Sequence, residues 1–296
     1  MISNSSVQQT TGLENVSSAY RGYSKPTRFF SVVKATMLMN FQITKRYRAN
    51  LIGGIFQGFL FIVFFGLMAS VISLRTEQVI SQMENGVFLF FLSGLLLMFF
   101  TDTCLFTPSN SVRRDLYNGT LEAVYFNPSS RYGYFVGYIL SDTIVLGLLF
   151  FPIILIPIFI LASSSPYNIS MILLTLGLAT ISFIAMGVMV ALMVIVWKEV
   201  SSIIGILSVV MQFLTGGLFP LSAFPEPLRY VAWLLPHTWA YDLIRYYSFD
   251  GQWNSILPIE IEFMILGVFT IVYTFITLFL LKKTEHHAKT KGLHLI

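Results

Sequence analysis

Long apolar stretches separated by short polar segments dominate this sequence. Each is close to the ~20 residues that a helix needs to cross the hydrocarbon core of a bilayer. A chain in lipid must satisfy its backbone hydrogen bonds internally, as helices do. The six stretches lie near residues 52–73, 86–107, 134–161, 169–196, 200–220 and 257–281. The pattern therefore predicts an all-α polytopic membrane protein with six transmembrane helices.

The segment before the first apolar stretch has a different pattern. In residues 26–48, Phe29, Val33 and Met37 recur at near-helical spacing, and basic residues fall mostly between the apolar ones. This predicts an N-terminal amphipathic helix that lies at the membrane interface. Residues 1–25 are polar, so we expect a disordered N-terminal tail followed by one transmembrane domain over residues 26–296.

A third kind of pattern lies between the fifth and sixth stretches. Residues 216–245 contain two glycines and four prolines among many aromatic side chains. These residues break helices, so the segment is predicted to be a re-entrant hairpin with bends at Pro220 and Pro236 and short helices that do not cross the membrane. Asp242 and Arg245, three residues apart, are expected to pair on the last turn of such a helix.

The distribution of charge predicts the orientation. Of the 18 Lys and Arg residues, all except Arg75, Arg229 and Arg245 fall on the side of the two termini. The positive-inside rule then predicts a multi-pass protein of the plasma membrane with both termini in the cytoplasm, which makes the hairpin external. The N-terminal basic cluster adjoins a span, so its predicted partner is the lipid bilayer and not nucleic acid.

Two carboxylates, Asp102 and Asp142, fall within the second and third stretches. An acid in a membrane is costly, so each has either a structural role or a role in transport. Gly54 with Gly58 and Gly133 with Gly137 form small-xxx-small pairs, which indicate either a contact between subunits or packing within the bundle.

Residues for conventional chemistry are missing from the sequence. It contains no Gly-Lys-Ser/Thr phosphate loop, no Gly-x-Ser-x-Gly elbow and no paired-cysteine metal site. The single cysteine, Cys104, excludes an internal disulfide. We therefore predict no catalytic residues, no bound metal and no cofactor, and a protein that is not an enzyme.

Two segments carry a resemblance to a known family. The loop over residues 108–133 combines a basic-acidic pair, a Gly-Thr-Leu-Glu run and a following Pro-Ser pair. Its candidate functional residues are Arg113, Arg114, Asp115, Gly119, Thr120 and Glu122. The 216–245 segment supplies Phe219, Pro220, Pro225, Pro236, Asp242 and Arg245. Both patterns, in this order, resemble the type-2 ABC exporter permeases.

The resemblance implies a transmembrane permease subunit of an ATP-driven exporter. In that family the 108–133 loop carries the coupling helix that contacts a separate ABC ATPase subunit, which holds the ATP and Mg²⁺. It also implies a second permease subunit, the same or different. Family members export drugs, lipids, teichoic acids or O-antigens. Two alternatives stay open: a secondary carrier or channel that uses Asp102 and Asp142, and a membrane-assembly protein that transports nothing.

Overall fold

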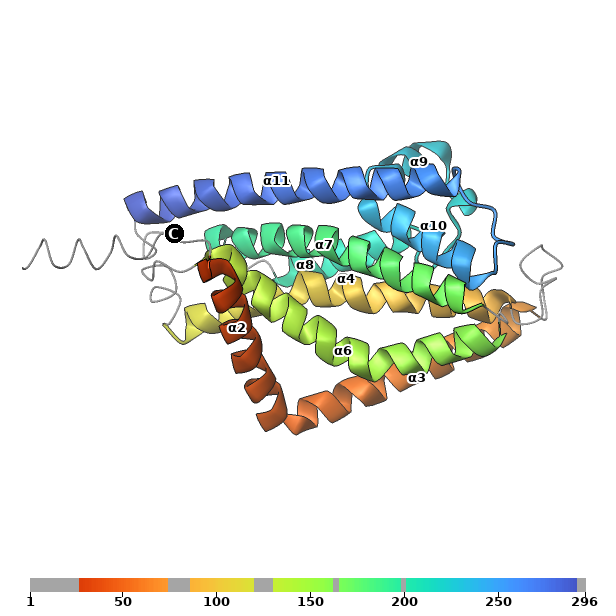
Figure 1. Ribbon diagram of the computed structural model, residues 1–296, viewed down its shortest axis with the longest axis horizontal. Helices are drawn as coiled ribbons and strands as arrows, with labels where there is room; N and C mark the ends of the chain where they lie inside the picture. The colour runs from red at the N-terminus through yellow and green to blue at the C-terminus, as the bar shows by residue number, and fades with distance from the viewer. Residues whose placement is uncertain (1–26, 74–85, 120–129, 162–164, 198–200, 292–296) are drawn as a thin grey trace, which may run out of the picture.

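The computed structural model describes residues 27–73, 86–119, 130–161, 165–197 and 201–291, and every regular element in these ranges is helical (Figure 1). The elements are α2 (Thr27–Arg46), α3 (Arg48–Ser73), α4 (Gly86–Tyr117), α6 (Arg131–Leu161), α7 (Pro166–Trp197), α8 (Ser201–Leu214), η1 (Leu221–Ala223), α9 (Glu226–Trp233), α10 (Pro236–Ser248) and α11 (Ile259–Lys291). The predicted N-terminal tail and residues 120–129 of the 108–133 loop lie outside the described residues.

Four helices are long and apolar enough to cross a membrane: Ile52–Val71, Gly86–Tyr117, Pro166–Val194 and Ile259–Thr284. These confirm a polytopic helical protein. Helix α6 has 31 residues, but α8 has only 14. At 1.5 Å per residue α8 is about 21 Å long, less than the ~30 Å core. The fifth predicted span is thus shorter than expected, and the count of six spans stays a prediction.

Successive long helices run in opposite directions, so their connections gather at the two ends of the bundle (Figure 1). One end holds the C-terminal part of α4 and the first turns of α6, and we call it the loop end. The other holds residues 215–258 with α9 and α10, and we call it the hairpin end. Helix α4 packs against α3, α6, α7, α8 and α10, which makes it the central element of the bundle.

Helix α2 runs at a steep angle to the long helices and packs against α6 (Figure 1). The predicted amphipathic helix is therefore present, and its position at a membrane surface stays a prediction. A Cβ at Gly137 would lie 2.7 Å from the Cβ of Thr36, and one at Gly133 would lie 3.1 Å from the carbonyl oxygen of Phe29. This glycine pair thus serves packing within the chain. A Cβ at Gly54 meets nothing within 4 Å.

The contact between α4 and α7 depends on a proline and a glycine. Pro108 lies inside α4 and has no N–H, so the carbonyl of Cys104, four residues earlier, loses its helical hydrogen bond. Gly187 of α7 packs directly on this carbonyl, because an ideal Cβ at Gly187 would lie 1.8 Å from the Cys104 oxygen. Only glycine permits an approach this close.

We predict that Gly187→Ala destabilises the bundle, because the added methyl group overlaps the backbone of α4. Overpacking of a well-packed interior costs about 1–3 kcal/mol or more. Thermal unfolding of the purified protein in detergent measures the effect. Gly177→Ala is the matched control on the same helix, since a Cβ there meets nothing within 4 Å. Equal unfolding temperatures for the two variants would contradict the assignment.

Candidate functional site

The last turn of α4 carries three of the residues that the sequence singled out. Arg113, Arg114 and Asp115 are half-buried there. The helix ends at Tyr117, and Gly119 in the turn that follows has a φ of 67°, which lies in the left-handed region. A Cβ at Gly119 would meet nothing within 4 Å, so backbone conformation and not space selects glycine.

Two tyrosines of α6 form hydrogen bonds with this turn of α4. The Nη2 of Arg114 donates a hydrogen bond of 2.5 Å to the hydroxyl of Tyr138, and its Cζ lies 5.1 Å from the centre of that ring. The hydroxyl of Tyr134 donates to the Oδ2 of Asp115. The adjacent base and acid are thus bound across the helix contact. Thr120 and Glu122 lie outside the described residues, so their roles stay predictions.

Asp142 joins three helices. Its Oδ1 accepts a 2.6 Å hydrogen bond from the Nδ2 of Asn40 on α2. Its Oδ2 accepts a 2.8 Å hydrogen bond from the hydroxyl of Thr107 on α4. Since both oxygens of the carboxylate are used between helices, the geometry favours a structural role for this acid.

Asp102 joins α4 to α8. Its Oδ1 accepts hydrogen bonds from the hydroxyl of Ser208 and, at 3.0 Å, from the Nε2 of Gln212. Gln212 also donates to the Ser208 hydroxyl at 3.1 Å. The two intramembrane acids do not share a site, because their partners lie on different helices. Within the described ranges no group of three or more His, Cys, Asp or Glu side chains is arranged to hold a metal ion.

The segment at the hairpin end is broken as the sequence predicted. Helix α8 ends at Leu214, Gly216 has a φ of 89°, and Pro220 precedes the short helix η1. Pro225 caps α9, and Pro236 begins α10. The prediction of short helices with bends at Pro220 and Pro236 is confirmed. That the segment re-enters a membrane stays a prediction.

The expected pair between Asp242 and Arg245 is not formed. Asp242 accepts hydrogen bonds of 2.7 Å from the Nε1 of Trp253 and from the backbone N–H of Ile256. Arg245 donates at 2.9 Å to the carbonyl oxygen of Gly217. The expectation assumed an exposed helix face, whereas both side chains are buried and take partners from the surrounding chain.

Arg245 fastens the 215–220 turn to α4. It is 2% exposed, and its Cζ lies 3.7 Å from the centre of the Phe90 ring of α4. Burial lowers the pKa of Arg245 to about 10, so the guanidinium is charged at neutral pH. A cation on an aromatic face gains most when it is desolvated. The charge therefore holds α10, the Gly217 turn and α4 together.

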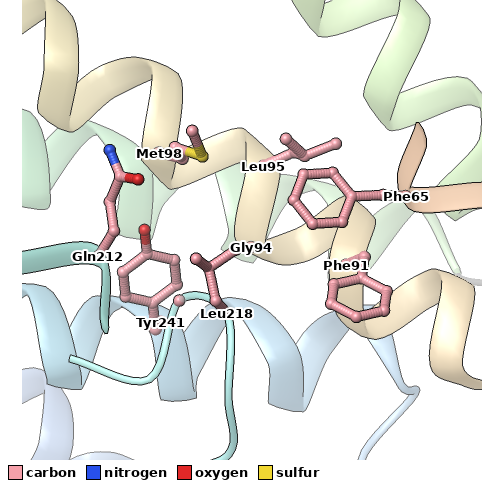
Figure 2. A pocket seen from close by; sticks show the side chains of 9 residues that line it. Phe65, Phe91, Gly94, Leu95, Met98, Gln212, Leu218 and Tyr241 are labelled. Atoms are coloured by element: carbon pink, nitrogen blue, oxygen red, sulfur yellow. The ribbon is translucent and has the colours of Figure 1, made fainter. Parts of the chain in front are cut away.

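A small pocket lies where this turn meets α4 (Figure 2). Figure 2 shows Gln212 and Tyr241 on one side and the rings of Phe65 and Phe91 on the other. A Cβ at Gly94, which also lines the pocket, would lie 2.5 Å from the carbonyl oxygen of Gly217. Glycine at this position lets the turn touch the backbone of α4. Phe219, next to the turn, is 49% exposed.

Sequence reasoning missed several residues that the structure places in these contacts. They are Asn40, Thr107, Tyr134, Tyr138 and Glu262. Glu262 is fully buried at the start of α11 and accepts a 2.9 Å hydrogen bond from the backbone N–H of Leu257. A detectable signal existed only for the tyrosines, whose spacing of four residues places them on one helix face.

Comparison with known families adds an independent finding. The model of the family described as ABC-2 type transporter matches residues 30–249. The match spans the chain from α2 to the end of α10, and it includes the loop end and residues 215–249 of the hairpin end. A comparison with curated proteins gives no match.

The two acids are expected to differ in their contribution to stability. Asp142→Ala removes the hydrogen-bond partner of Asn40 and of Thr107, which lie on separate helices, and a buried polar group without a partner costs about 1–3 kcal/mol. Asp102→Ala leaves Ser208 and Gln212 bonded to each other, so it costs less. Thermal unfolding in detergent checks the order of the two variants. If Asp102→Ala were less stable than Asp142→Ala, this account of how the two acids join the helices would be wrong.

Proposed function

The chain belongs to the ABC-2 type transporter family, and on that basis we propose that it is the permease subunit of an ATP-driven exporter. As a member of that family it is a transmembrane component of an ABC transporter. The proposal adds the direction of transport and a separate ATPase subunit that binds ATP and Mg²⁺. It assigns hydrolysis to that second chain because this sequence contains no Gly-Lys-Ser/Thr phosphate loop.

The observation that carries the proposal is the architecture of the loop end. Tyr117 is 74% exposed, and Asn118 and Gly119 are exposed beside it. This exposed corner continues directly from the turn of α4 that is bonded to α6. Exposed aromatic and arginine side chains are typical anchors of protein interfaces. A partner bound here acts on two long helices at once.

The orientation follows from the same arrangement. We propose that α3, α4, α6, α7, α8 and α11 are the six spans and that the loop end faces the cytoplasm. The excess of basic residues on the side of the termini supports this assignment. The hairpin end is then external, and α8 reaches its side of the membrane together with the 215–220 turn. The protein is placed in the plasma membrane.

We further propose that two permease subunits form the pathway, as a homodimer or a heterodimer. The exposed apolar face of α3, with Phe56, Phe59 and Val63, is available either to lipid or to the second subunit. The intramembrane acids support ATP-driven transport over a secondary carrier. Both are hydrogen-bonded within the chain, and their partners in these bonds are neutral hydroxyl and amide groups.

Labelling of introduced cysteines tests the orientation. A membrane-impermeant maleimide should modify a cysteine at the exposed Gln252 in intact cells, and a cysteine at the exposed Asn118 only after lysis. Cys104 is fully buried and should stay unlabelled in both conditions. The opposite pattern would reverse the orientation and remove the loop end from the ATPase.

Substitutions at the exposed corner test the coupling. Tyr117→Ala and Gly119→Val should leave the folded yield unchanged and weaken ATPase binding by about 5- to 30-fold, which corresponds to ~1–2 kcal/mol for a lost anchor or a strained backbone. The measurement is co-purification of a co-expressed ABC ATPase subunit, followed by its hydrolysis rate in lipid.

Tyr47→Ala is the matched control for these variants. Tyr47 is 58% exposed at the joint of α2 and α3, away from the corner. It should retain full ATPase binding. Wild-type binding and hydrolysis in both corner variants would refute the assignment of the loop end as the docking element.

A further inference from the structure

We propose that Tyr134 and Tyr138 are positioning residues for coupling, which bind the loop end of α4 to α6 so that the two helices move as one unit. The inference rests on the proposed function, because it concerns how force from an ATPase reaches the bundle. It concerns residues outside the loop itself, which neither contact the solvent-exposed corner nor belong to the sequence motif.

The geometry starts from the adjacent base and acid at the end of α4. Tyr138 is 2% exposed and accepts from Arg114, whereas Tyr134 is 9% exposed and donates to Asp115. A guanidinium can only donate hydrogen bonds and a carboxylate can only accept them, so each hydroxyl takes the role that its charged partner requires. The two rings pack edge-to-face with 5.0 Å between their centres, which fixes both hydroxyls.

The two tyrosines belong to a longer stripe on α6. Tyr134, Tyr138 and Asp142 follow one another at intervals of four residues, and this spacing places all three on one helix face. Their partners on α4 are Asp115, Arg114 and Thr107. We call these three contacts the polar stripe. Over eight residues of α6 it extends for about 12 Å along the helix contact.

The polar stripe also reaches α2. Asp142 binds Asn40 of α2, and Gly137 of α6 sits against Thr36 of the same helix. The loop end of α6 is therefore fastened to α4 on one side and to α2 on another. A force applied at the exposed corner moves all three helices together, because separating α4 from α6 breaks hydrogen bonds to charged groups, which are stronger than bonds between neutral groups.

A distance measurement in the full chain tests whether the polar stripe holds α4 to α6. Spin labels on cysteines at Asn118 and Ile144, both exposed, report the position of the α4 end relative to α6 in lipid nanodiscs. Cys104 is fully buried and takes no label. We expect one narrow distance distribution for the otherwise unchanged chain. The double variant Tyr134→Phe with Tyr138→Phe should broaden it, since each lost bond to a charged group shifts the population about tenfold, or ~1.4 kcal/mol.

Tyr132→Phe is the matched control on the same helix. Its ring stacks on Phe29 with 6.0 Å between centres, and loss of its hydroxyl should leave the distribution unchanged. If the double variant gave the same narrow distribution as the unsubstituted chain, the two tyrosines would not hold α4 to α6 and the proposal would be wrong. Folding defects are distinguished by the distribution of the control and by the folded yield of each variant.

A second measurement tests the link to coupling. The ATPase should co-purify with the double variant as it does with Tyr132→Phe, but its stimulation by the permease, per bound complex in lipid, should fall about tenfold. A broadened distance with unchanged stimulation would overturn the positioning role. Failure of the unsubstituted chain to bind any ATPase would instead refute the proposed function. The distance measurement would still decide whether the two tyrosines hold α4 to α6.

Discussion

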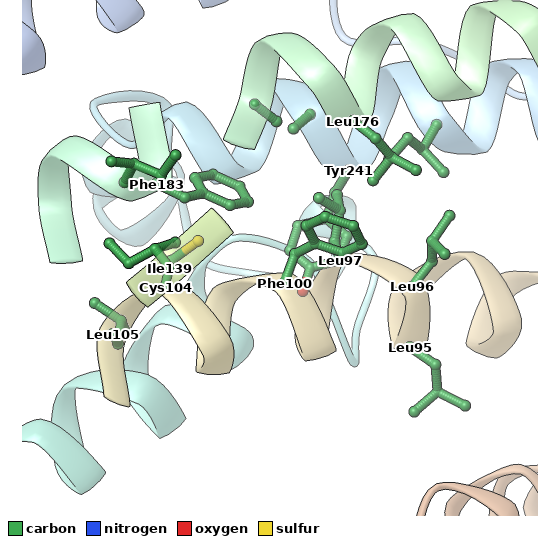
Figure 3. Packing of buried hydrophobic residues seen from close by; sticks show 14 of the residues in the cluster. Leu95, Leu96, Leu97, Phe100, Cys104, Leu105, Ile139, Leu176, Phe183 and Tyr241 are labelled. Atoms are coloured by element: carbon green, nitrogen blue, oxygen red, sulfur yellow. The ribbon is translucent and has the colours of Figure 1, made fainter. Parts of the chain in front are cut away.

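Backbone contact with α4 is the constraint on which the rest of the bundle depends. In lipid no hydrophobic force drives helices together, so close packing and hydrogen bonds must do so. Gly187 lies on the carbonyl of Cys104, and Gly94 lies on the carbonyl of Gly217. Figure 3 shows buried apolar side chains of this core, among them Leu97, Phe100 and Cys104 of α4 and Phe183 of α7. Small residues at two points thus determine which surfaces become the core.

Three charged groups of the interior share a second feature. Asp102, Asp142 and Arg245 are each bound by neutral groups from other helices or turns: hydroxyls, amides, a carbonyl and an aromatic ring. Neutral partners satisfy a charge without requiring a second buried charge, which would add its own desolvation cost. Each charge therefore acts as a connection between segments that are distant in sequence, and the transporter gains defined helix contacts from residues that resemble ion sites in the sequence.

The sequence predicted the features that depend on local composition. Apolar length gave the long helices, alternating basic and apolar residues gave α2, and prolines gave the breaks at residues 220 and 236. Features that depend on distant partners escaped prediction. Helix α8, expected as the fifth span, ends at Leu214 because Gly216 and Gly217 turn the chain onto α4, and Asp242 and Arg245 bind Trp253 and Gly217 instead of each other. The tyrosine contacts were missed because a phenol within an apolar stretch resembles an ordinary core side chain.

The two sets of contacts on α4 meet at Pro108. On its loop side, Arg114 and Asp115 are bonded to α6. On its hairpin side, Cys104 is fixed to α7 by Gly187. A proline inside a helix removes one hydrogen bond and is the commonest place for a bend. The hydrogen bonds to α6 run from Asp115 to Thr107, just past Pro108. From Cys104 toward the hairpin end, α4 is in contact with α7 at Gly187 and with the Gly217 turn at Gly94. Pro108 thus lies where the contacts with α6 and with α7 adjoin.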